Sequence, residues 1–298
     1  MAAVLRESVD QSENEKDFIL NALRESGKRM DGRTPNEMRY IKLNFGRREC
    51  ESYVEVQLGQ TRVSALVTAD IVAPYPDRPA EGFLFFNVEL SQMAAPSIEG
   101  GRASILTVEL TRLVERCVRD SRALDQEGLC LVAGQKVWSI RCDLHVLNHG
   151  GNLVDATVLA AMAALQHFRC PETTVVDAGG GAPAAVVRHP ADERPPRPLA
   201  LHHVPLTLTA ALLDEGKFVL VDPTDREEAV SGGRVSFGLN AHRELCALHK
   251  MGGTPMAPEA LLGCLRAASA KVGELQKLLR GALAAADRRA GEAALGRL

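Results

Sequence analysis

Three arginines lie on one predicted helix at a spacing that suits the binding of consecutive phosphates. Arg112, Arg116 and Arg119 are separated by four and three residues, and Arg102 lies at the glycine-rich start of the same segment. At 3.6 residues per turn, this spacing keeps the three side chains within a stripe of roughly 60°. Guanidinium groups in such a row can follow successive phosphates of a nucleic acid. The candidate RNA-binding residues are therefore these four arginines.

The same arginines also fit an ordinary solvated helix face. Glu115 can pair with Arg119, and Glu109 can pair with Arg112, because each pair lies about one turn apart. Composition alone favours this second interpretation, and the sequence leaves both open.

A second candidate anion site is the turn HGGN at residues 149–152, which joins a predicted strand to a predicted helix. The free amides at a helix N-terminus and the helix dipole can together bind a phosphate. Glycine turns also serve merely to connect elements, so a plain connection is the alternative.

Acidic residues gather between two predicted strands in the sequence DPTDREE, residues 222–228. Clustered carboxylates can bind Mg²⁺ or act as an acid and base pair. Asp-Pro-Thr is also favoured in turns, and Arg226 can neutralise a neighbouring carboxylate. The alternative is an ordinary turn between strands.

No nucleophile or metal-binding motif accompanies these candidates. His202 and His203 fall in a predicted strand, where adjacent side chains face opposite ways and cannot share a metal. The seven cysteines never occur as CxxC, which indicates a reducing compartment without disulfides or a zinc site. The phosphate-binding pattern GxxxxGK[ST] does not occur either.

Length and composition limit the class of protein. A chain of 298 residues with 46% hydrophobic and 24% charged residues suggests roughly two globular domains. The formal net charge of −3 means that any nucleic-acid site must be a local basic patch. The most apolar stretch, residues 153–165, is shorter than a bilayer span and contains Asp155, so we expect no membrane partner.

Hydrophobic periodicity predicts the elements that position the candidates. In the N-terminal part we expect helices over residues 13–26, 103–120 and 155–168, and strands over residues 53–58, 62–69 and 138–146. Glycine and proline interrupt both periods between residues 177 and 198, so we place domains at 1–185 and 186–298. For the second domain we expect strands at about 200–210, 217–221, 234–239 and 243–249, followed by a helix over 258–289.

Short motifs spread in order along the chain resemble the RNase PH family. They are KRMDGR at 28–33, EGFLFFN at 81–87, LSQMAAP at 90–96, GR at 101–102, VAGQKVW at 132–138, LNHGGN at 147–152 and VDPT at 221–224. The resemblance implies an α+β fold of two βαβα halves, each similar to the second domain of ribosomal protein S5. It also implies a six-membered ring around a channel for single-stranded RNA, in which active members use phosphate to release nucleoside diphosphates.

Two places depart from the pattern of active members. Those members resemble one another in a Gly-Gly-Ser/Thr-Arg turn for phosphate, whereas this chain continues with Asn152 and Leu153. The positions that we match to two catalytic aspartates, after Asp222, are occupied by Glu228 and Arg234. Because positioning and charge stabilisation supply most of the acceleration in phosphoryl transfer, we expect no catalysis, no metal and no cofactor.

Alternatives to a non-catalytic ring subunit stay open at this point. One is an active phosphate-dependent 3′-to-5′ exoribonuclease that uses Asp222 and Glu228, and another is an RNA-binding module outside a ring. For the ring subunit, the resemblance implies a role in assembly and RNA guidance during ribosomal RNA maturation and mRNA turnover. In the family's inactive subunits, arginines on the matching helix face a neighbouring subunit's site.

The resemblance also implies partners and locations. The expected partners are other RNase PH-like exosome ring subunits, especially of the ribosomal RNA-processing protein 41 type, cap subunits with S1 or KH domains, and single-stranded RNA. The expected locations are the nucleus, the nucleolus and the cytoplasm.

Overall fold

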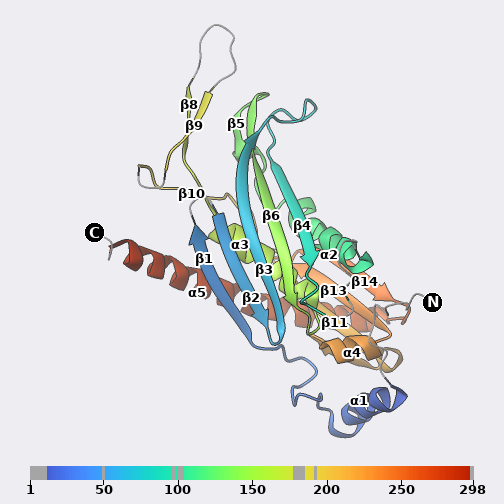
Figure 1. Ribbon diagram of the computed structural model, residues 1–298. Helices are drawn as coiled ribbons and strands as arrows, with labels where there is room; N and C mark the ends of the chain where they lie inside the picture. Colours follow the sequence, from blue (N-terminus) through green and yellow to red (C-terminus); the bar gives the residue numbers. More distant parts are fainter. Residues whose placement is uncertain are drawn as a thin grey trace, which may run out of the picture.

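The chain forms two large β-sheets with a helix, α3, packed between them (Figure 1). The computed structural model describes residues 12–48, 51–95, 98, 104–176, 185–190 and 193–295. After the first helix, α1, each half of the chain runs strands, helix, strands, helix, in agreement with the predicted α+β class.

The larger sheet belongs to the N-terminal half, and its strand order is β1-β2-β3-β6-β4, with β5 paired to β6. All neighbours are antiparallel except β4 and β6. The bounds are Ile41–Arg48 (β1), Glu51–Leu58 (β2), Thr61–Val72 (β3), Phe83–Leu90 (β4), Cys130–Val132 (β5) and Lys136–Asn148 (β6). The three predicted strands are confirmed as β2, β3 and β6, whereas the hydrophobic pattern did not predict β1 or β4.

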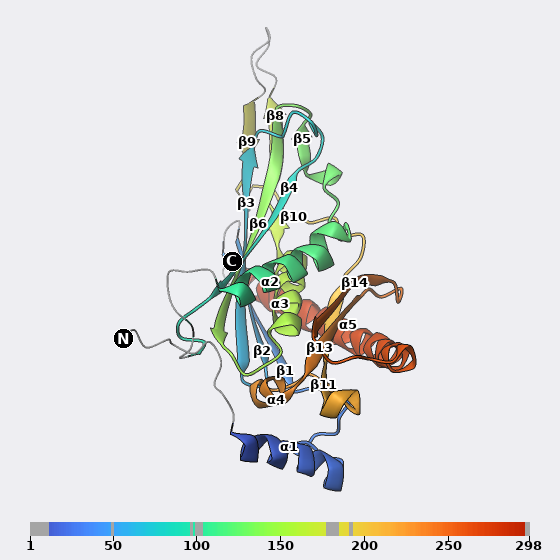
Figure 2. The ribbon, with the colours of Figure 1, turned by 90° about the vertical axis from the view of Figure 1, so that its right-hand side faces the viewer.

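One face of this sheet packs on α3, Leu153–His167. Val54 pairs with Ala65 and Val56 with Val63, and all four side chains are fully buried. Helix α3 is buried almost throughout because β11 and α2 cover its other sides. Figure 2 shows α3 and α5 on the same side of the larger sheet.

The first two helices differ in how closely they follow the prediction. Helix α1 spans Glu13–Ser26 as predicted, and it ends because Gly27 adopts a φ of 63°. Helix α2, Ile105–Glu115, continues into a π-helical turn, Arg116–Asp120. The predicted regular helix over 103–120 is therefore wrong in its last turn.

The second sheet has the order β12-β11-β13-β14 and is entirely antiparallel. The strands of this sheet are Leu206–Leu213 (β11), Phe218–Val221 (β12), Gly233–Leu239 (β13) and Leu245–Gly252 (β14). The helices of this half are Asp225–Val230 (α4) and Pro258–Leu295 (α5). His202 and His203 precede β11 and are not in a strand, so that prediction was wrong. In the described part of the chain, no helix combines the length and the apolar character needed to cross a membrane.

The segment that connects the two halves in the sequence forms two small β-ribbons. Strands β7 (Arg169–Cys170) and β10 (Arg197–Pro198) form one of them, and β8 (Thr173–Val176) and β9 (Ala185–Arg188) form the other. The proposed boundary between residues 185 and 186 falls inside β9 and stays a prediction. The glycine-rich residues 177–184 lie outside the described residues.

Candidate functional site

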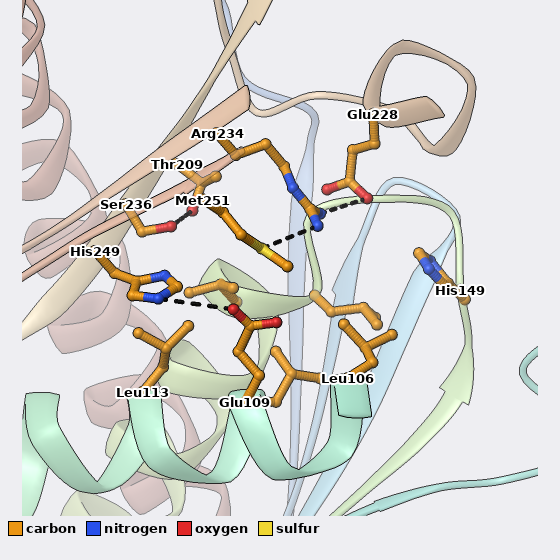
Figure 3. Close-up of a pocket in the computed structure, with 13 residues that line it drawn as sticks. Leu106, Glu109, Leu113, His149, Thr209, Glu228, Arg234, Ser236, His249 and Met251 are labelled. Atoms are coloured by element: carbon orange, nitrogen blue, oxygen red, sulfur yellow. Dashed lines mark hydrogen bonds and ion pairs between the residues drawn. The ribbon is translucent and has the colours of Figure 1, made fainter. Parts of the chain in front are cut away.

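A pocket of about 100 Å³ lies where the two halves of the chain meet (Figure 3). Leucines of α2 and the start of α3 form its apolar floor, together with Met251. Its polar lining consists mainly of His149, Glu109, Glu228, Arg234 and His249. The structure thus brings together the predicted glycine turn, the predicted acidic segment and the predicted arginine helix, which are far apart in the sequence.

The glycine turn approaches the second half of the chain at backbone distance. Gly151 has a φ of 89°, and a Cβ atom there would lie 2.4 Å from the backbone nitrogen of Asp225. Only glycine fits both the left-handed conformation and the close approach. The Thr61 hydroxyl donates to the Gly151 carbonyl at 2.6 Å, so the turn is also held from the larger sheet.

A carboxylate of the protein already binds the start of α3. The backbone amide of Asn152 donates to Oε1 of Glu228 at 2.9 Å. Nη1 of Arg234 lies 3.0 Å from Oε2 of the same carboxylate. The Glu228 side chain is 12% exposed. The position at which an external anion was predicted therefore has an internal anion beside it.

The acidic segment is a short helix and not the predicted turn. Thr224 caps α4 with its hydroxyl, and Glu227 reaches back to the Thr224 amide at 2.8 Å, which completes a capping box. The sequence T-D-R-E, with Thr at the N-cap and Glu three residues later, is the signal for this helix start. Among the described residues, no group of three His, Cys, Asp or Glu side chains could bind a metal ion.

Asp222 is fully buried, and both oxygens of its carboxylate accept hydrogen bonds. It accepts hydrogen bonds from the Arg39 amide at 2.8 Å, from Arg39 Nη2 at 2.7 Å and from Asn152 Nδ2 at 2.7 Å. Arg33 Nη1 lies 3.2 Å from the same carboxylate. Burial alone would raise the pKa of Asp222, but the hydrogen bonds and charge of Arg39 hold it below the ordinary value.

A second buried ion pair fixes the N-terminal segment beside this carboxylate. Arg29 Nε donates to Glu227 Oε1 at 2.8 Å, and Arg29 Nη2 pairs with the other oxygen. Arg29 also donates to the carbonyls of Val221 and Asp222 at 2.7 and 2.8 Å. Sequence reasoning missed Arg29, Arg33 and Arg39 as parts of the site, because nothing in their spacing reveals partners about 190 residues away.

Asp155 lies at the start of α3 behind Asn152 and is fully buried. Its carboxylate accepts from the Thr209 amide at 2.9 Å and from Asn152 Nδ2 at 2.8 Å. The pKa of Asp155 is raised to about 6, mainly by burial and also by the charge of Asp222, against the hydrogen bonds from Asn152 and Thr209 that lower it. The signal for this residue was a single acid in an otherwise apolar stretch.

His149 faces the pocket as a neutral group. Its Nδ1 atom accepts from the Gly151 amide at 3.1 Å, so Nε2 bears the ring hydrogen. Burial lowers the pKa of His149, while the charge of Glu228 opposes this shift. His249 Nε2 lies 3.6 Å from Oε1 of Glu109. Figure 3 marks this contact with a dashed line, on the opposite side of the pocket from His149.

The predicted arginines differ in their surroundings. Arg112 and Arg116 are exposed, and neither forms an ion pair within the described ranges. Arg119 pairs with Glu115 at 2.9 Å, as expected for a solvated face, and it lies with Arg116 in the π-helical turn. Glu109 pairs with His249 and not with Arg112, so that predicted pair is wrong.

Arg102 lies outside the described residues. The assignment of RNA binding to Arg102, Arg112, Arg116 and Arg119 stays a prediction, since the structure contains no nucleic acid.

The sequence of this chain is similar to that of a known family of proteins. Two models of the 3′ exoribonuclease family match, domain 1 over residues 37–171 and domain 2 over residues 203–271. The chain is 45% identical to Exosome complex component RRP45 of Bos taurus over 90% of its own length and 59% of that protein. It is 44% identical to Exosome complex component RRP45A of Arabidopsis thaliana, over 92% of this chain and 88% of that one.

A solved structure gives the same result for the fold. The chain superimposes on a protein of the Archaeoglobus fulgidus exosome with RNA bound to the active site, with a TM-score of 0.77 and 28% identity. The match covers 89% of this chain and 97% of that one.

Proposed function

Because this chain belongs to the 3′ exoribonuclease family of RNase PH-like proteins, we propose that it is a non-catalytic ring subunit of an RNA exosome. The resemblance that its motifs predicted is confirmed by the two family matches and by the RRP45 relatives. The chain spans 59% of the length of the bovine relative, so its activity and partners are proposed here from its own residues and from the likeness.

One observation supports the loss of catalysis above all others: the Glu228 carboxylate lies between the Asn152 amide and the Arg234 guanidinium. The attacking phosphate of active members would need the donors of this turn. A carboxylate already accepts from the first of them and would repel a phosphate dianion in a site of low dielectric constant. The site therefore disfavours the phosphate that the reaction consumes.

The position of Asp222 supports the same conclusion. Its oxygens accept from Arg39, Arg33 and Asn152, and its pKa lies below the ordinary value. A carboxylate that is buried, ionised and fully paired is unsuited to give a proton to a leaving oxygen. Arg234 adds a positive charge where an active member would have a carboxylate, which is unfavourable for a metal ion.

The remaining role is assembly and guidance of RNA. We propose that Arg112 and Arg116, and Arg102 with Arg119 in support, contact single-stranded RNA at the boundary with a neighbouring subunit. The proposed neighbour is a ring subunit of the ribosomal RNA-processing protein 41 type, and the proposed caps contain S1 or KH domains. The nucleus, the nucleolus and the cytoplasm are the proposed locations, because the family resemblance implies roles in both ribosomal RNA maturation and mRNA turnover.

The experiment has an assembly arm and a chemical arm. Native mass spectrometry of the chain isolated from its host should show it together with other RNase PH-like subunits, and a free monomer would overturn the proposal. The pure chain, incubated with oligoadenylate, phosphate and Mg²⁺, should release no ADP. ADP that appears with the wild type and is lost in Glu228→Gln would instead establish the phosphorolytic enzyme.

A further inference from the structure

The ribbon formed by β8 and β9 is isolated from the two large sheets. Figures 1 and 2 both place it at the end of the molecule opposite α1. Its strands pair over residues 173–176 and 185–188, and neither packs extensively on any other described helix or strand. A two-stranded ribbon alone is only marginally stable in water, so this one needs a surface to pack on.

Both faces of the ribbon present apolar side chains to solvent. Val176 and Val187 lie on one face and are 48% and 47% exposed, and Val175 lies on the other and is 40% exposed. A ribbon at the edge of a monomer normally has polar residues on its solvent face. Valines on both faces are instead typical of a strand pair that is covered on both sides in an assembly.

Contacts at the base of the ribbon hold it in one orientation. The Arg188 guanidinium lies 5.2 Å from the centre of the Trp138 ring and 3.8 Å from the Asp70 carboxylate. The Thr174 hydroxyl lies 2.7 Å from His189 Nε2. The ribbon is therefore anchored at its base, and its valines are presented in a defined position.

The charges around the ribbon favour a protein partner over RNA. Three arginines lie on the ribbon or close to it, and three carboxylates accompany them: Arg188, Arg194 and Arg197 with Asp70, Glu172 and Glu193. Arg197 pairs with Glu172 at 2.7 Å, so this surface has little unpaired positive charge for phosphates. Because charges of both signs are balanced around the valines, the surface fits a protein partner with an aliphatic centre and a mixed polar rim better than a phosphate backbone.

We propose that the β8 and β9 ribbon is an assembly arm that inserts into an apolar groove of the neighbouring ring subunit. This inference rests on the proposed function, because it requires a ring. It goes beyond that function by assigning part of the contact to Val175, Val176 and Val187.

The test replaces the three valines together by threonine, which keeps the β-branched shape and adds a hydroxyl. Co-expressed with ring and cap subunits, the variant should bind its ring neighbour on the order of a hundred-fold more weakly than the wild type. The control is Leu262→Gln on α5, an apolar side chain that is 52% exposed and lies outside both the ribbon and α2. Circular dichroism and the melting temperature of the isolated chain establish that both variants fold.

The outcomes distinguish a failure of the assembly arm from a failure of the proposed function. Unchanged assembly of the triple variant in a ring that does form would overturn the arm while leaving the proposed function standing. A wild type that joins no ring would overturn the proposed function itself. A photo-crosslinker at position 187 that reaches a ring subunit supports the arm, and one that reaches only a cap subunit or RNA overturns it.

Discussion

The backbone amide of Asn152 donates to the carboxylate of Glu228 at 2.9 Å, across 76 positions of the sequence. The contact joins the first residue before α3 in one half to α4 in the other half. It satisfies an amide that would otherwise be unpaired at a helix start, and it leaves Glu228 positioned to pair with Arg234. The chain thus places its own carboxylate at the helix start where the sequence predicted an external anion.

Replacing Glu228 should therefore lower the stability of the folded protein. We expect Glu228→Ala to lower the free energy of unfolding by about 2 kcal/mol, because the variant loses an N-terminal hydrogen bond and leaves Arg234 without its partner. Urea denaturation measures this change. Glu274→Ala is the control, because that glutamate is exposed beside Lys271, and its loss should cost less than about 0.5 kcal/mol. Equal effects of the two changes would contradict the role assigned to Glu228.

The buried pair of Arg29 and Glu227 gives a larger effect. Arg29→Met should lower the free energy of unfolding by about 3–5 kcal/mol, since Glu227 would stay buried without its cation. Adding Glu227→Met should recover part of that loss. A double-mutant cycle in urea measures the coupling, and Arg24→Met serves as the control, since the Arg24 side chain is 48% exposed in its pair with Asp214. Strictly additive losses would show that the two side chains do not act as a pair.

Local sequence patterns predicted the helices and strands better than they predicted which side chains contact one another. The alternation of residues 138–146 and the glycine after Ser26 suffice to predict β6 and the end of α1, because both depend on neighbours in the chain. The motifs also predicted the family. Strand β4 was missed, although its burial alternates, because its run of apolar residues resembles a buried segment of either type.

The site required tertiary information. Glu228 was placed correctly in an acidic cluster, but only the fold shows that its partners are Asn152 and Arg234. The three arginines of residues 29–39 bind acids of the other half, and no periodicity encodes such a pairing. The π-helical turn at Arg116 shows the same limit, because the spacing of apolar residues predicted a regular helix through its buried Cys117 and Val118.

The raised pKa of Asp155 predicts a pH effect with a defined sign. The carboxyl has an ordinary pKa of 3.8 and a folded value of about 6, so its contribution to stability is present below pH 3.8 and is lost as the pH rises through 6. Asp155→Asn keeps an acceptor for the Thr209 amide and removes the buried charge. It should raise the free energy of unfolding at pH 7 by roughly 2–3 kcal/mol and leave it little changed at pH 4.

Urea denaturation between pH 4 and pH 7 measures this difference. Asp70→Asn is the control, since its carboxylate is 79% exposed and should show no comparable dependence. A difference between Asp155→Asn and wild type that does not vary with pH would refute the assignment.

Gly151 should be the most sensitive glycine of the site. Gly151→Ala places a Cβ atom 2.4 Å from the Asp225 nitrogen and should destabilise the protein by more than about 3 kcal/mol. Gly134→Ala separates the two causes, because Gly134 also has a positive φ, of 76°, but has no atom within 4 Å of the added carbon. Backbone strain alone should cost about 1 kcal/mol at Gly134, and similar melting temperatures for the two variants would show that the close approach is unimportant.

Two exposed arginines, Arg112 on α2 and Arg116 in the π-helical turn that follows it, should act on RNA through charge. Replacing Arg112 and Arg116 by alanine removes two cations without breaking an ion pair, so binding of single-stranded RNA to the assembled ring should weaken and its logarithmic salt dependence should fall by about 1.4. Arg119→Ala should have a smaller effect, because Glu115 and Asp120 already neutralise its guanidinium. Fluorescence anisotropy at several salt concentrations measures both quantities. Lys277→Ala with Arg280→Ala on α5 removes the same charge from another surface, and an equal loss of binding in that control would show that only net charge matters.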